Sequence, residues 1–150
     1  MGPLRAELVD GLRALDLPLD AAQVDLLMDY LGLLEKWNRV YNLTAVRELP
    51  EMLTHHLLDS LAAVGPLVRE TDGRRVRLLD VGSGGGLPGV VIAIACPQID
   101  VTCVDTVAKK AAFLQQAAAS LGLANLRGLQ ARVETLDQRR GEGYDVICSR

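Results

Sequence analysis

Residues 78–89, Leu-Leu-Asp-Val-Gly-Ser-Gly-Gly-Gly-Leu-Pro-Gly, constrain the fold of this chain more than any other stretch. An apolar run leads into Asp80, a glycine-rich turn follows, and a proline then stands where a helix can begin. Because glycine has no Cβ and permits positive φ, such a turn can bring bare backbone against a nucleotide-like ligand. The spacing Gly84-x-Gly86-x-x-Gly89 also matches the dinucleotide fingerprint, which is a weak signal by itself. The stretch therefore predicts a strand, a ligand-binding loop and a helix.

Two aspartates indicate which ligand this loop would hold. Asp80 stands two positions before the first glycine, where a carboxylate would repel a pyrophosphate but would suit a positive group, such as the ammonium of S-adenosylmethionine. Asp105 ends the run 100–105, 25 residues after Asp80, an offset at which a second-strand carboxylate meets ribose hydroxyls. Nicotinamide cofactors carry the same ribose diol, so only Asp80 separates the two ligands. The plainer alternative is that Asp105 caps the next helix and the glycines form only a tight turn.

Composition limits the class of protein. With 150 residues, 49% apolar and 23% charged, the chain has the composition of one folded domain. We see no apolar run of membrane-spanning length and no secretory signal, which predicts a cytoplasmic protein. Cys96, Cys103 and Cys148 lack metal-ligand spacing and are expected to be reduced core residues, with no metal site. The net charge of −3 gives no general basic footprint, so any nucleic-acid surface must be local or lie outside these residues.

The first half of the chain, residues 1–75, has a helical pattern. Leucines recur at helical spacing near the amino terminus, and further helices are expected to begin at Asp20 and Pro50. The Gly-Pro pair at 65–66 is expected to end the third of these helices. The stretch 37–44 has no clean periodicity and is expected to form a structured loop. We expect this segment to pack on a sheet formed by the second half.

The second half, residues 76–150, alternates between strand and helix patterns, which indicates a doubly wound parallel sheet of the Rossmann-like type. The expected strands cover residues 76–81, 101–105, 126–130 and 144–149, with helices ending at 95 and covering 108–121. The sequence stops directly after the fourth strand, which would leave an apolar edge strand bare. We therefore expect a shortened chain that lacks the C-terminal strands of its sheet.

Several motifs together resemble one known family, the bacterial small-subunit ribosomal RNA guanine-N7 methyltransferases, also called glucose-inhibited division protein B. The amino-terminal signature is carried by residues 37–44, Arg47 and 52–61, and the cofactor loop by 80–89 with its Leu-Pro-Gly ending. Further motifs follow in the family's order at 109–114, 132–134 and 149–150. The resemblance implies a class I S-adenosylmethionine-dependent methyltransferase fold with strand order 3-2-1-4 in this half. Family members continue beyond the last residue of this chain into a helix and three more strands that form most of the acceptor pocket, so the resemblance also implies an inactive or incomplete form.

The resemblance also implies site residues. It places S-adenosylmethionine over the carboxyl ends of the first two strands. Together with the two aspartates, the expected cofactor-binding residues are Asp80, Gly82, Ser83, Gly84, Gly86, Leu87, Asp105, Val133, Glu134 and Arg150. No catalytic residue is identified apart from the candidate Arg150, which would orient the base or grip a phosphate. Candidate RNA contacts are Asn42, Arg47 and Lys109. The plainer alternatives are that Asn42 packs within the fold and that Lys109 is a solvated surface residue.

The reaction implied by the resemblance is methyl transfer from S-adenosylmethionine to N7 of a guanine in small-subunit (16S) ribosomal RNA. The partner would be the small ribosomal subunit or an assembly intermediate. The guanine N7 carries a free lone pair, so its attack on a sulfonium methyl needs no general base. The two histidines accordingly need no catalytic role, and His56, on an apolar helix face, is expected to be hydrogen-bonded within the structure. Two other functions stay open, a nicotinamide-dependent oxidoreductase and a non-catalytic interaction module with the same fold.

Overall fold

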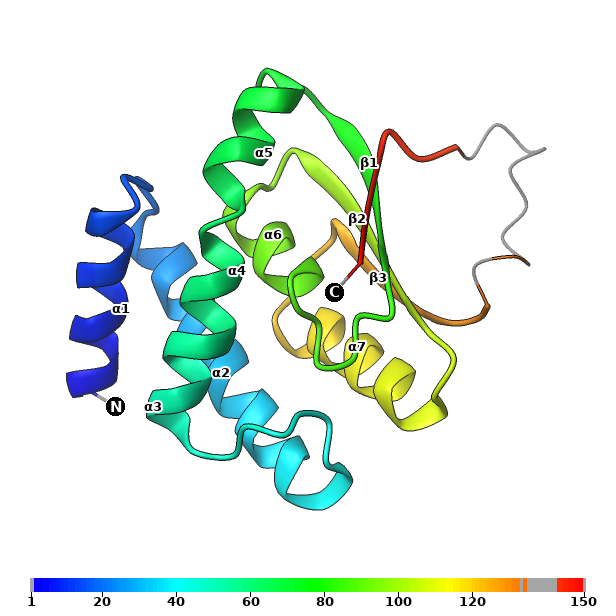
Figure 1. Cartoon of the computed structure of the whole chain (residues 1–150), viewed down its shortest axis with the longest axis horizontal. Coiled ribbons are helices and arrows are strands. Elements are labelled where there is room, and N and C mark those ends of the chain that lie inside the picture. The colour runs from blue at the N-terminus through cyan, green and yellow to red at the C-terminus, as the bar shows by residue number, and fades with distance from the viewer. Residues whose placement is uncertain (1, 133, 135–142, 150) are drawn as a thin grey trace.

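A four-stranded parallel sheet forms the second half of the molecule in the computed structural model, which describes residues 2–132, 134 and 143–149 (Figure 1). The strands are β1 (Val76–Val81), β2 (Ile99–Asp105), β3 (Leu126–Gln130) and β4 (Val146–Ser149). Their order across the sheet is β3-β2-β1-β4, and in the register Leu78 of β1 lies between Val101 and Val146. This confirms the predicted parallel sheet and the strand order 3-2-1-4.

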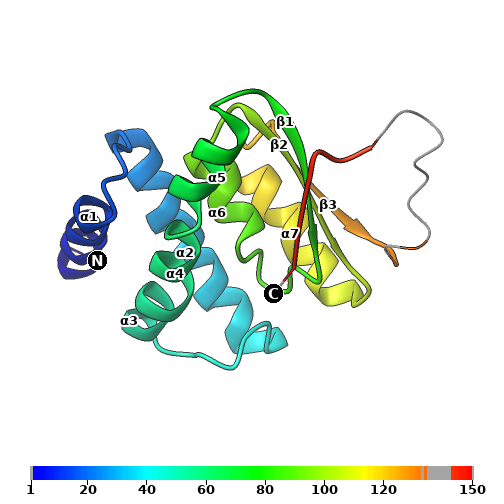
Figure 2. The ribbon, with the colours of Figure 1, turned by 45° about the horizontal axis from the view of Figure 1, so that its top comes forward.

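Helices cover one face of the sheet in two layers. The helices are α1 (Gly2–Ala14), α2 (Ala21–Tyr41), α3 (Leu49–Met52), the π-helix η1 (Leu53–Leu58), α4 (Asp59–Leu61), α5 (Val64–Thr71), α6 (Gly89–Ala95) and α7 (Ala108–Ser120). Helices α6 and α7 pack on the sheet, and α2 packs on both of them from outside (Figure 2). The N-terminal helical segment thus reaches the sheet through α6 and α7, and the two parts share one apolar core. Within the described residues, no helix is long and apolar enough to cross a membrane.

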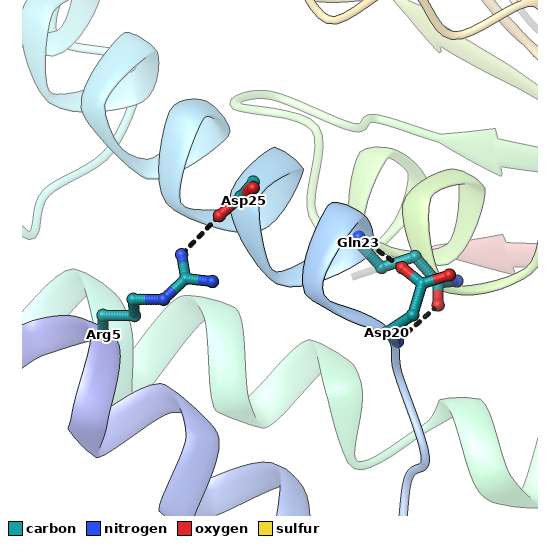
Figure 3. Close-up of polar contacts among 4 residues, drawn as sticks. All are labelled: Arg5, Asp20, Gln23 and Asp25. Carbon is teal, nitrogen blue, oxygen red and sulfur yellow. Dashed lines mark hydrogen bonds and ion pairs between the residues drawn. The ribbon is translucent and has the colours of Figure 1, made fainter.

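The start of α2 explains how the N-terminal segment is fixed to α6. Asp20 and Gln23 form a capping box, in which Asp20 Oδ1 accepts the Gln23 backbone N–H at 2.8 Å and Gln23 Oε1 accepts the Asp20 N–H at 3.0 Å (Figure 3). The same glutamine donates through Nε2 to the carbonyl oxygens of Ile94 and Ala95, at 3.1 and 3.2 Å. One amide therefore caps the beginning of α2 and the end of α6 together.

The carboxyl end of α2 corrects one expectation. The stretch 37–44 was expected to be a loop, but α2 continues through Tyr41. The Trp37 ring packs edge-on against Phe113 of α7 at 5.5 Å between centroids and lies 5.2 Å from the Tyr41 ring. This packing against a distant helix stabilises a turn whose own sequence has no helical period. The helix ends at Asn42, whose φ of 52° is left-handed.

The region after Pro50 corrects a second expectation. The predicted single helix is divided into α3, η1 and α4, and the chain turns before residue 64. The Gly-Pro pair at 65–66 lies inside the first turn of α5 and does not end a helix. Proline is tolerated there because the first N–H groups of a helix have no partner within the helix. The π-helix η1 carries His56, whose Nε2 shares a 2.5 Å hydrogen bond with Thr44 Oγ1, so the predicted structural role of this histidine is confirmed.

Candidate functional site

A hollow of about 520 Å³ lies at the carboxyl ends of β1 and β2 and beside the segment after β3. Its lining residues are Val81, Gly82, Val104, Asp105, Thr106, Ala131, Arg132 and Glu134. Because β1, β2 and β3 are parallel, their carboxyl ends meet at one edge, where open α/β sheets bind ligands. The hollow thus lies where the sequence predicts the cofactor, and it contains the predicted residues Gly82, Asp105 and Glu134.

Asp105 is the buried acidic residue of this hollow, with 7% of its surface exposed. Its Oδ2 accepts the backbone N–H of Gly84 at 3.0 Å, and its Oδ1 accepts that of Val107 at 2.9 Å. Val107 is the N-cap residue of α7, and this helix has no side-chain cap hydrogen bond, so Asp105 orders the turn before α7 without capping the helix. An ionised carboxylate has about four lone-pair positions, so two backbone donors leave capacity for further hydroxyl donors.

The glycines of the loop divide into two kinds. Gly82 lines the hollow with a φ of 69°, and a Cβ built on it would meet no atom within 4 Å. Its backbone is therefore open to a ligand. Gly89 is buried instead, and a Cβ there would lie 2.3 Å from Cys103 Sγ and 2.7 Å from Asp80 Oδ2. Gly89 thus permits α6 to pack tightly on β1 and β2.

Asp80 lies beneath the loop, not in the hollow. It is 0% exposed, and its Oδ2 accepts the Gly89 backbone N–H at 2.9 Å. The Cys148 thiol donates to Asp80 Oδ1 at 3.7 Å. The carboxylate therefore caps the start of α6, which has no capping side chain of its own at Pro88. A direct contact between Asp80 and the cofactor would need the loop to open, and it stays a prediction.

The cysteines are not activated nucleophiles. All three thiols are free, as expected, and Cys96 and Cys103 are buried. Burial raises the pKa of Cys96 to about 11, and burial followed by the nearby charge of Asp80 raises the pKa of Cys148 to about 12. The same two causes raise the pKa of Cys103. Because the thiolate is the nucleophilic form, these thiols are unsuited to covalent catalysis near neutral pH.

Other predicted cofactor residues serve the loop itself. Ser83 is buried and donates through Oγ to the Asp80 carbonyl at 2.9 Å, and Gly86 and Leu87 are also buried. These residues and Gly84 do not line the hollow, so their contact with the cofactor stays a prediction. The remaining predictions, Val133 and Arg150, lie outside the described residues.

The candidate RNA contacts fall into two groups. Asn42 and Arg47 are both exposed, and Arg47 Nη2 donates to Asn42 Oδ1 at 2.7 Å. The intervening Leu43 is buried, with its carbonyl oxygen 4.0 Å from the position of a Cβ on Gly84. This segment therefore lies beside the glycine loop. Lys109 is separate, exposed in the first turn of α7.

Buried polar side chains of α2 support these loops and were not predicted from the sequence. Asn38 accepts the Thr44 N–H at 2.8 Å and donates to the Val46 carbonyl at 3.1 Å, which fixes the segment after α2. Tyr30 donates its hydroxyl to the Gly85 carbonyl at 2.5 Å. Both residues stand among the apolar positions of the helix, and only the tertiary structure reveals their partners.

The sheet order, the glycine loop after β1 and the acid at the end of β2 define a Rossmann-like fold of the kind found in class I methyltransferases. Two solved structures share it. Coclaurine N-methyltransferase, bound to N-methylheliamine and SAH, aligns over 99% of this chain and 49% of its own, with a TM-score of 0.51 and 17% identity. A Plasmodium falciparum protein described as a protein-L-isoaspartate O-methyltransferase, in complex with S-adenosyl-L-homocysteine, aligns over 95% and 71%, with a TM-score of 0.57 and 14% identity.

Sequence comparisons give the family. The model of rRNA small subunit methyltransferase G matches residues 23–150. Relatives named ribosomal RNA small subunit methyltransferase G occur in Acidovorax ebreus, Acidovorax sp. strain JS42 and Paracidovorax citrulli, with 64%, 66% and 63% identity. The alignments cover 98%, 94% and 99% of this chain but 67%, 64% and 62% of the relatives. The chain belongs to the rRNA small subunit methyltransferase G family, as the sequence motifs predicted, and spans about two thirds of the length of these relatives.

Proposed function

We propose that this protein transfers a methyl group from S-adenosylmethionine to N7 of a guanine in small-subunit (16S) ribosomal RNA. Family membership supports the RNA substrate class, and the hollow beside Asp105 supports a nucleoside cofactor. Residues 76–150 would hold the cofactor, and residues 1–75 would form the helical segment that buttresses its loop. The partner would be the small ribosomal subunit or an assembly intermediate in the cytoplasm.

The observation that carries this proposal is the placement of Asp105 at the hollow. Its carboxylate is held by the N–H groups of Gly84 and Val107, so it is oriented before a ligand arrives. A pre-oriented carboxylate with free lone pairs suits the two hydroxyls of a ribose. Gly82 leaves open backbone at the carboxyl end of the neighbouring strand β1, where the remainder of the cofactor would pass. Glu134, on the lip of the hollow, would then flank the adenine.

The proposed chemistry needs few functional groups. When bound, S-adenosylmethionine supplies a methyl group on a positively charged sulfur. The chain's own residues would hold this group in line with the guanine N7, which has a lone pair and no proton to remove. The high thiol pKa values described above accord with a reaction that requires no protein nucleophile.

The RNA would approach beside the segment that carries Asn42 and Arg47. Their hydrogen bond holds the guanidinium against Asn42, in the exposed segment that passes the loop after β1 at Leu43, where a phosphate or a base edge could bind. Lys109 would add a phosphate contact from α7, and Arg150 would act near the reacting base.

The oxidoreductase alternative is not favoured. The family match and the named relatives all belong to RNA methyltransferases, whereas Gly84-x-Gly86-x-x-Gly89 is a short pattern that the methyltransferase loop also satisfies. A non-catalytic module would bind the cofactor without transferring methyl, so methyl transfer itself has to be measured.

The test is methyl transfer from tritiated S-adenosylmethionine to small ribosomal subunits isolated from cells that lack this modification. N7-methylguanine is then located by borohydride reduction and aniline cleavage. We expect one cleavage site, with incorporation reduced in Asp105→Asn and unchanged in Asp100→Asn, an exposed acid at the other end of β2. Methylation at another atom would refute the proposed acceptor. The absence of methylation by a protein that binds the cofactor would refute it as well.

A further inference from the structure

Tyr30 joins the N-terminal helical segment to the middle of the glycine loop. Its side chain is 0% exposed in α2, and its hydroxyl donates to the Gly85 carbonyl at 2.5 Å. Its ring also packs against Phe113 of α7, with centroids 6.5 Å apart. The hydroxyl is therefore held in place from two sides of the helical layer and has little freedom to leave the loop.

A second residue of α2 also contacts Gly85. Leu34, one helical turn after Tyr30, packs so closely on the loop that a Cβ on Gly85 would lie 2.8 Å from Leu34 Cδ1. The missing side chain at Gly85 thus permits α2 to approach the loop backbone directly. The loop conformation depends on this helix as well as on the sheet.

The loop segment Gly84-Gly85 is hydrogen-bonded on both sides to groups from different parts of the chain. Asp105 at the end of β2 accepts the Gly84 N–H at 3.0 Å, and Tyr30 donates to the Gly85 carbonyl. Gly82 and Asp105 both line the hollow. Gly82 lies two residues before Gly84, and Asp105 is hydrogen-bonded to Gly84. A shift of the segment Gly84-Gly85 would therefore change the position of both the loop backbone and the Asp105 carboxylate at the hollow.

We propose that Tyr30 is a positioning residue for cofactor binding, which holds the glycine loop in its ligand-competent conformation through the Gly85 carbonyl. This inference rests on the proposed function, because it takes the hollow beside Asp105 to be the cofactor site. It assigns part of the cofactor affinity to a helix that does not itself line the hollow.

The size of the effect follows from the population of competent loop conformations. If the loop without this bond is competent for only roughly one third to one tenth of the time, the apparent dissociation constant rises about three- to tenfold. Tyr30→Phe removes the hydroxyl and keeps the ring against Phe113. The association rate should fall by the same factor, because the competent loop must form before the ligand binds.

The experiment measures S-adenosylhomocysteine binding by calorimetry and stopped-flow, together with urea unfolding, for the wild type, Tyr30→Phe and Thr71→Val. Thr71 is a matched control, because it is also buried and its Oγ1 donates to a backbone carbonyl, Leu67 O, at 2.8 Å. It lies in α5 and does not line the hollow. Both variants should unfold at lower urea concentration, but only Tyr30→Phe should bind the ligand more weakly and more slowly.

Gly85→Ala tests the same contact from the loop side, since its Cβ would lie 2.8 Å from Leu34 Cδ1 and either the loop or this side chain must shift. We expect weaker binding in this variant as well. Wild-type affinity and association rate in a folded Tyr30→Phe, or in Gly85→Ala if Tyr30→Phe does not fold, would overturn the positioning role. Failure of the wild type to bind S-adenosylhomocysteine would instead refute the proposed function on which the inference rests.

Discussion

The carboxylate of Asp105 accepts the backbone N–H of Gly84 at 3.0 Å, which ties the end of β2 to the loop after β1. One buried residue thus shapes the loop and lines the hollow. The two backbone hydrogen bonds of Asp105 are compatible with its proposed ligand-binding role, because each carboxylate oxygen can accept more than one hydrogen bond.

Replacing Asp105 by Asn should weaken binding of S-adenosylmethionine by roughly ten- to a hundredfold, because a charged acceptor contributes about 1.5–3 kcal/mol. It should also lower stability, since an amide cannot accept at both of the positions now used by Gly84 and Val107. Calorimetric titration and urea unfolding measure the two effects. Wild-type affinity in this variant would remove Asp105 from the site. The exposed Asp100 of the same strand provides the control, Asp100→Asn.

Gly89→Ala should destabilise the protein by about 1–3 kcal/mol, because the added methyl group overlaps Cys103 Sγ and Asp80 Oδ2. The double variant Gly89→Ala/Cys103→Ala removes one of these overlaps and should recover part of the loss. Urea unfolding of the two single variants and the double variant gives the coupling free energy. Strictly additive losses of unfolding free energy would mean that α6 moves as a whole, and that the contact between residue 89 and Cys103 does not cause the destabilisation.

Gln23→Ala should cost about 1–2 kcal/mol of unfolding free energy, because it removes the side-chain acceptor of the Asp20 N–H in the capping box and the donors to the Ile94 and Ala95 carbonyls. A neighbouring contact of the same helix offers a contrast in Figure 3. Arg5 and Asp25 form an exposed ion pair at 2.5 Å, and Asp25→Asn should cost less than about 1 kcal/mol. Equal losses in the two variants would show that the Gln23 amide does not connect α2 to α6.

The raised thiol pKa values predict a stability loss at alkaline pH. The ordinary thiol pKa is 9.0, and the folded values are about 11 for Cys96 and about 12 for Cys148. Because the folded state holds these protons more tightly, their contribution is fully present below pH 9 and is lost as pH rises toward 12. Urea unfolding from pH 8 upward should show this decline, and Cys96→Ala and Cys148→Ala should each reduce its slope. Unchanged slopes would contradict the assigned pKa values.

The elements that could be predicted from sequence are those whose signals are local. The strands 76–81 and 126–130 match β1 and β3, since short apolar and β-branched runs between turn residues carry their own pattern. Asp105 was also found by spacing, because strand, loop and helix lengths in such a fold vary little. The edge of the sheet that carries the hollow therefore follows from the sequence.

The supporting contacts could not be predicted in this way. Trp37 extends α2 through its packing against Phe113, 76 residues along the chain, and Tyr30 bonds a loop 55 residues away. Asp80 is a further example. Its position in the sequence indicates the site, but only the fold shows that its carboxylate binds the Gly89 N–H at the start of α6. Such long-range partners depend on how helices pack, and sequence spacing along one element does not encode them.

The most direct measurement is a calorimetric titration of the protein with S-adenosylmethionine, followed by a competition with NAD. We expect saturable one-to-one binding of S-adenosylmethionine that NAD does not displace. Binding of NAD alone, or the absence of binding to either ligand, would contradict the assignment of the hollow beside Asp105 as the S-adenosylmethionine site.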